Sequence, residues 1–84
     1  MSPEVVEILK RLDDLLESAK QELPNSLEDI RDCVEETKNQ LREGTTWSKA
    51  KRLFFSIKGF VCESGKLAKA VMDAIDFAQK VLPV

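Results

Sequence analysis

Apolar residues recur along this chain at intervals of three and four residues, the spacing that places them on one face of an α-helix. In the first segment this stripe consists of Val5, Leu9, Leu12, Leu16, Ala19 and Leu23. Ser2 followed by Pro3 suits a helix start, because serine is a favoured N-cap and proline is favoured at the first helical position. Pro24 disfavours the helical conformation at the residue before it. The pattern predicts a helix over residues 3–22.

The second segment repeats this design with a stripe of Leu27, Ile30, Val34, Thr37 and Leu41. Asn25 or Ser26 is expected to cap the helix, with an acidic residue three positions on as the partner in a capping box. Gly44 suits the position just past the C-terminus, where a positive φ is wanted. We therefore predict a helix over residues 27–43.

The third stripe consists of Trp47, Ala50, Phe54, Ile57 and Val61. Thr45 or Thr46 can cap this helix, which we expect to cover residues 47–63. Gly59 lies inside it and is interpreted as a close contact between helices or a slight kink.

The fourth stripe consists of Leu67, Val71, Ala74, Ala78 and Val81, and it predicts a helix over residues 66–82. Ser64 and Gly65 form the only break before it, and they make either a full chain reversal or a bend in one long helix. No segment alternates with period two, so no strand is expected. Four helices of similar length with short connections favour an all-α fold, an antiparallel up-down-up-down four-helix bundle, in one domain over residues 1–84.

Charge is divided unevenly between the two halves of the chain. Residues 1–44 hold twelve acidic and six basic residues, and residues 45–84 hold three acidic and seven basic residues. The halves can therefore pair with each other, with copies of the chain, or with an oppositely charged partner.

The stretch 47–60 holds four of the five aromatic residues of the chain and four basic residues. On a helical projection most of its apolar side chains fall in one arc, which predicts that they are core: Trp47, Ala50, Leu53, Phe54, Ile57, Phe60 and Val61. Phe55 lies outside this arc, near Cys62, and Lys51 and Lys58 lie between it and Trp47 around the helix.

The helix over residues 66–82 is apolar over roughly 220° of its circumference, against roughly 120° for the main stripes of the first two helices. Three neighbours cannot cover so wide an arc, so we expect a contact surface for another chain or domain. Its predicted members are Lys51, Phe55, Lys58, Cys62, Met72 and Ile75. The alternative is that the helix over residues 66–82 is simply the most central element, with Phe55, Ala68 and Met72 as scattered surface apolar residues of the ordinary kind.

An acidic patch is predicted on the outer face of the second helix. It consists of Glu28, Asp32, Glu36 and Glu43, with Asp29 beside them. Such a patch can meet the basic rim of the third helix on a neighbouring molecule, and head-to-tail contacts of that kind generate rings or filaments. The alternative is a solvated face that maintains solubility.

Catalytic chemistry has little support in the sequence. The chain contains neither histidine nor tyrosine, and two cysteines without histidine cannot make a usual structural zinc site. Cys33 lies at the edge of the second stripe, where a buried inert thiol is expected. Gly44, Gly59 and Gly65 are too far apart for a phosphate-binding loop. We expect no enzymatic activity, no cofactor and no metal.

These features predict a non-enzymatic protein-interaction or oligomerisation module of the adaptor or signalling kind. No apolar run is long enough to cross a bilayer, and two reduced thiols suit the cytoplasm. The Met-Ser-Pro start and the end on "VLPV", where Pro83 could open a linker, lead us to expect the N-terminal module of a longer protein.

In helix number and length, the chain resembles the small four-helix modules at the N-termini of multidomain signalling and cell-death proteins. That resemblance implies partner recruitment or membrane attack, so a membrane-permeabilising effector domain that touches the membrane surface is the alternative prediction. Weak nucleic-acid binding through the basic residues and Phe55 is a third. The net charge of −2 argues against it.

Overall fold

Four helices account for most of the chain in the computed structural model, which describes residues 2–62 and 64–84. They are α1 (Pro3–Glu22), α2 (Leu27–Glu43), α3 (Trp47–Val61) and α4 (Gly65–Val81), and the short 3₁₀ turn η1 (Pro24–Ser26) joins the first two. No strand occurs within these described ranges. The predicted all-α class is confirmed.

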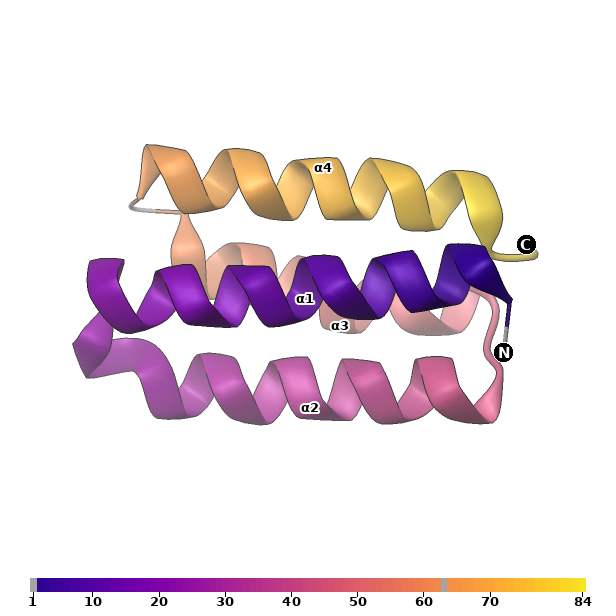
Figure 1. Ribbon diagram of the computed structural model, residues 1–84, viewed down its shortest axis with the longest axis horizontal. Coiled ribbons are helices and arrows are strands. Elements are labelled where there is room, and N and C mark those ends of the chain that lie inside the picture. Colours follow the sequence, from indigo (N-terminus) through magenta and orange to yellow (C-terminus); the bar gives the residue numbers. More distant parts are fainter. Residues whose placement is uncertain (1, 63) are drawn as a thin grey trace.

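The helices form an antiparallel bundle in which each packs against two neighbours. α1 contacts α2 and α4, and α3 contacts the same two helices, so α1 and α3 lie on one diagonal. Figure 1 shows α1 in front of α3, with α4 above and α2 below, in a bundle of 33 × 20 × 19 Å. The chain reverses fully between α3 and α4, which excludes the predicted alternative of one long bent helix.

Side-chain caps begin three of the four helices, because the first backbone N–H groups of a helix have no partner inside it. The hydroxyl of Ser2 accepts from the N–H of Val5 at 3.2 Å. Thr46 and Ser64 cap α3 and α4 in the same way. The predicted capping box of α2 is wrong, since Ser26 makes no side-chain cap and a 3₁₀ turn leads into the helix instead.

Three predicted boundaries differ from the structure by one or two residues. α3 ends at Val61 rather than at 63, and α4 covers Gly65–Val81 rather than 66–82. Ser64 has an extended backbone and caps α4, so the fourth helix begins directly after it. Residue 63 itself lies outside the described residues. At the other end of α4, the carbonyl of Pro83 accepts from the N–H of Trp47 at 2.7 Å and ties the C-terminal segment to the start of α3.

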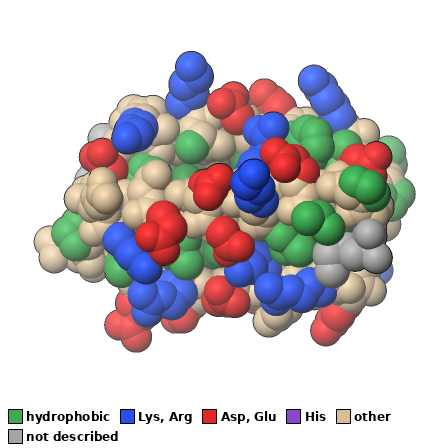
Figure 2. Space-filling view, viewed as in Figure 1, with side chains coloured by type: hydrophobic (Ala, Val, Ile, Leu, Met, Phe, Trp, Pro, Cys, Tyr) green, Lys and Arg blue, Asp and Glu red, His purple; other side chains and the backbone are tan. Residues whose placement is uncertain are grey.

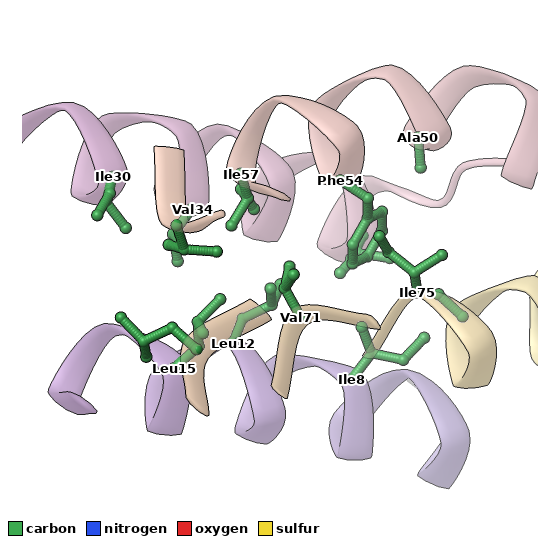
Figure 3. Close-up of a cluster of buried hydrophobic side chains, with 14 of the residues drawn as sticks. Ile8, Leu12, Leu15, Ile30, Val34, Ala50, Phe54, Ile57, Val71 and Ile75 are labelled. Atoms are coloured by element: carbon green, nitrogen blue, oxygen red, sulfur yellow. The ribbon is translucent and has the colours of Figure 1, made fainter. Parts of the chain in front are cut away.

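The core runs along the bundle axis and takes side chains from all four helices, as Figure 3 shows. The buried lines of α2 and α3 are largely those predicted, and Thr37 is buried among them with its hydroxyl donating to the Cys33 carbonyl at 2.7 Å. On α1 the buried line is rotated, and it consists of Ile8, Leu12, Leu15 and Ala19. Several residues of the predicted α1 stripe are only partly buried, since they flank this line: Val5, Leu9, Leu16 and Leu23.

The expectation of excess apolar surface on α4 is wrong in its largest part. Its wide arc is covered because α4 packs against both α1 and α3, which take up its two flanks. Among the described residues, the large apolar side chains that remain exposed are Val6, Phe55, Phe60 and Val84. Phe60 was expected in the core, and at 41% exposure it is instead a surface residue of α3.

Gly59 is expected to weaken α3 without serving a contact, because a Cβ placed there would meet nothing within 4 Å. Gly59→Ala should therefore stabilise the protein by about 0.5–1 kcal/mol, through helix propensity and lower entropy of the unfolded chain. Urea denaturation measures the change. Gly44→Ala is the matched control, since φ there is +89° and alanine should destabilise the protein by about 1 kcal/mol or more. A destabilised Gly59→Ala variant would contradict this assignment.

Candidate functional site

The most exposed aromatic ring of the bundle belongs to Phe55, on the outer side of α3, with 47% of the residue accessible. Trp47 packs edge-on against this ring, with 6.4 Å between the ring centroids. The ammonium of Lys58 lies 5.7 Å from the Phe55 ring centroid, within cation–π range. The ring is thus supported from two sides while its outer part faces solvent.

Two further predicted residues share this side of α3. At 3.6 residues per turn, Cys62 lies about 20° and Lys51 about 40° from Phe55 around the helix. Both are exposed, and the thiol of Cys62 donates to the Gly59 carbonyl at 3.3 Å.

The two predicted members on α4 have different positions. Ile75 is 2% exposed and lies in the core near Ile8 and Phe54 (Figure 3), so its assignment to a contact surface is wrong. Met72 is partly buried. Phe77 marks the α1 side of α4, because the guanidinium carbon of Arg11 on α1 lies 4.8 Å from its ring centroid. Met72 is about 140° from Phe77 around the helix, so it lies on the α3 side of α4.

We call the resulting surface the Phe55 strip. It consists of Lys51, Phe55 and Lys58 on α3, Cys62 at the C-cap of that helix, and Met72 on the adjoining flank of α4. Phe60 does not belong to it, because it lies about 140° from Phe55 around α3, on the side that faces α2. The two exposed phenylalanines therefore do not form one continuous patch.

The predicted acidic residues are all exposed on α2, and we call them the α2 acidic face: Glu28, Asp29, Asp32, Glu36 and Glu43. Lys38 lies on the side of α2 toward α1, where it pairs with Asp13 at 2.6 Å, and the guanidinium of Arg42 donates to the side-chain oxygen of Asn39 at 3.1 Å. Among the described residues no carboxylate of the α2 acidic face lies in an ion pair. By contrast, acidic and basic side chains are interspersed on the face of the molecule that Figure 2 shows.

The four ion pairs among the described residues all lie between residues 7 and 38. None of them joins the acidic first half to the basic second half. The predicted pairing between the halves of one molecule is therefore not made at ion-pair distance in the described part of the chain.

A surface hollow of about 460 Å³ lies between α2 and α3, beside the α2 acidic face. Its lining residues are Glu36, Gln40, Ser48, Lys49, Arg52 and Leu53. Leu53 is partly buried and supplies an apolar floor, while the aliphatic stems of Lys49 and Arg52 can form walls. The apolar spacing of the sequence does not predict this hollow, because the hollow depends on which flanks of two helices meet.

The two cysteines differ in their surroundings. Cys33 is partly buried between α2 and α3, and its thiol donates to the Leu53 carbonyl at 3.5 Å. Burial raises the pKa of the Cys33 thiol, and the nearby Glu36 carboxylate raises it further. A raised pKa disfavours the thiolate, so this side chain is poorly suited to act as a nucleophile.

We expect a thiol-alkylating reagent to modify Cys62 at least about tenfold faster than Cys33 in the folded protein, because only Cys62 is exposed. Mass spectrometry of peptides after a short exposure to iodoacetamide measures both rates. In denaturant the two rates should become similar. Equal rates in the folded protein would show that Cys33 is more accessible than the structure indicates.

No group of side chains suited to hold a metal ion occurs in the described ranges. Nor is any helix built from them long and apolar enough to span a bilayer. Comparison of the chain with protein-family models, curated proteins and solved structures gives no significant match.

Proposed function

We propose that this four-helix bundle is a non-enzymatic protein-interaction or oligomerisation module, of the adaptor or signalling kind, acting in the cytoplasm. The observation that carries the proposal is the Phe55 ring, half-exposed and held between Trp47 and Lys58. A supported aromatic with a rim of cations is typical of residues that dominate binding energy, because such a ring loses little conformational freedom on binding.

The two cysteines, both free thiols, are compatible with a reducing compartment. The cationic rim also suits an anionic lipid surface, so membrane attachment is the rival function for the same strip. A protein partner is the better-supported choice, because the exposed apolar part of the strip is one ring and half-covered methionine, a small area for membrane insertion.

Site-specific photo-crosslinking in a cytoplasmic extract tests the interaction function. A benzophenone amino acid at position 55 should give covalent adducts with protein after irradiation. The same group at position 60 is the matched control, since Phe60 is also exposed on α3 but lies outside the Phe55 strip. Equal adducts from both positions, or none from position 55, would contradict the proposal.

A further inference from the structure

The Phe55 strip lies on α3 and the adjoining flank of α4, the α2 acidic face lies on α2, and the two surfaces are opposite in charge. We propose that this chain binds a second copy of itself head to tail, with the Phe55 strip of one copy seated on the α2 acidic face and adjoining hollow of the next. This inference rests on the proposed interaction function and names its partner.

Charge is the first observation that identifies the occupant. The described residues of α3 include no carboxylate, and the basic residues among them are Lys49, Lys51, Arg52 and Lys58. The α2 acidic face holds five carboxylates and no cation. The strip therefore contains no carboxylate and the acidic face contains no cation, so each supplies the charges that the other lacks, and opposite charges steer association and fix its register.

Spacing is the second observation. Lys51 and Lys58 are seven residues apart, which places them about 10.5 Å from each other along α3. The carboxylates of Asp29, Glu36 and Glu43 repeat at the same seven-residue interval along α2. Two lysines of one copy can therefore face two carboxylates of the next in a single register.

The hollow is the third observation, because the Phe55 ring must be accommodated by the partner surface when it leaves water. At about 460 Å³ the hollow has room for a phenyl ring, and it is open to solvent on its outer side. Leu53 at its floor offers apolar contact, and the Arg52 guanidinium can stack on an incoming ring. Glu36 lines the hollow and also belongs to the α2 acidic face. The Phe55 ring can therefore enter the hollow while Lys51 and Lys58 contact the carboxylates beside it.

A two-fold contact of the strip with itself is disfavoured. Such a contact would place Lys51 and Lys58 of one copy against the same residues of the other, and juxtaposed like charges oppose binding. The head-to-tail contact instead places Lys51 and Lys58 against carboxylates of the α2 acidic face, although Lys49 and Arg52 also line the adjoining hollow, and it leaves one strip and one acidic face unused at the ends. Such a contact continues into a closed ring or a filament.

Mixing of complementary variants tests the arrangement by analytical ultracentrifugation at low salt. Phe55→Ser impairs the strip and leaves intact the receptor surface, which is the α2 acidic face with the adjoining hollow. Asp32→Lys with Glu36→Lys impairs the receptor and leaves the strip intact. Each of these two variants alone should self-associate at least about 30-fold more weakly than the wild type, as expected for loss of a dominant contact. Their equimolar mixture should form a complex of two chains and stop there, since only one competent contact remains. If Phe55→Ser loses helical content, Lys51→Ser with Lys58→Ser carries the same test.

Three results would overturn this inference. A wild-type protein that stays a single chain up to millimolar concentration excludes self-association, and the crosslinking experiment then judges the proposed function separately. A dimer unaffected by the receptor substitutions indicates a two-fold contact. A single chain that sediments with phosphatidylserine vesicles, and loses this with Phe55→Ser, assigns the strip to the membrane.

Discussion

Replacing Ile75 by aspartate is expected to unfold the bundle. Ile75 is 2% exposed and lies among the core side chains of Figure 3, so a carboxylate there would be buried without an ion pair. The cost of such a group and of the lost packing exceeds about 4 kcal/mol. At about 0.05–0.15 kcal/mol per residue, a chain of 84 residues has a total stability of roughly 4–13 kcal/mol. Circular dichroism should show loss of most helical signal, or a much lower unfolding midpoint.

Phe55→Asp is the matched control for this prediction. Both residues belong to the contact surface predicted from sequence, but Phe55 is half-exposed, so its aspartate stays in water. The control should retain the helical signal of the wild type. Equal loss of structure in both variants would contradict the separation of core and surface described above.

Replacing Phe54 by alanine is expected to destabilise the protein by about 3–5 kcal/mol. Phe54 is fully buried, is the largest such side chain, and packs against Trp47 with 5.8 Å between ring centroids. Its removal loses the transfer free energy of the ring and leaves a cavity that the helices cannot fully close. Urea denaturation of Phe54→Ala measures the change in free energy of unfolding.

Phe54→Leu should lose clearly less free energy of unfolding than Phe54→Ala, because leucine retains most of the apolar volume of the side chain. A loss below about 1 kcal/mol in Phe54→Ala would show that the ring does not occupy the core centre.

Most of the fold could be predicted because the periodic apolar stripe is a local signal. The bounds of α1 and α2 agree with the prediction, and the N-cap at Ser2 and the positive φ at Gly44 follow from residue chemistry alone. The turn before α2 could not be predicted as well, since a 3₁₀ turn and a capping box use the same residue types. The end of α3 was harder to place, because its apolar stripe ends at Val61 and the sequence between Val61 and the Ser64 cap carries no periodic signal.

The candidate surface was predicted less accurately than the fold. A helical projection shows how wide an apolar arc is, but not how much of it neighbouring helices cover. Ile75 was misplaced because α4 is enclosed on both flanks, and Phe60 because the edge of the α3 arc toward α2 is left open. Phe55 was identified as outside the core arc, since it lies far from the centre of that arc on any packing.

In the proposed assembly, another copy of the chain covers the Phe55 strip. Light scattering across a concentration series, at low and high salt, tests it most directly with wild type, Phe55→Ser and the control Phe60→Ser. We predict that the mass of the wild type and of Phe60→Ser rises with concentration at low salt and falls at high salt, because screening weakens the charged contacts. Phe55→Ser should keep the mass of one chain throughout. A wild type that never exceeds one chain, or a Phe60→Ser variant as impaired as Phe55→Ser, would contradict the claim.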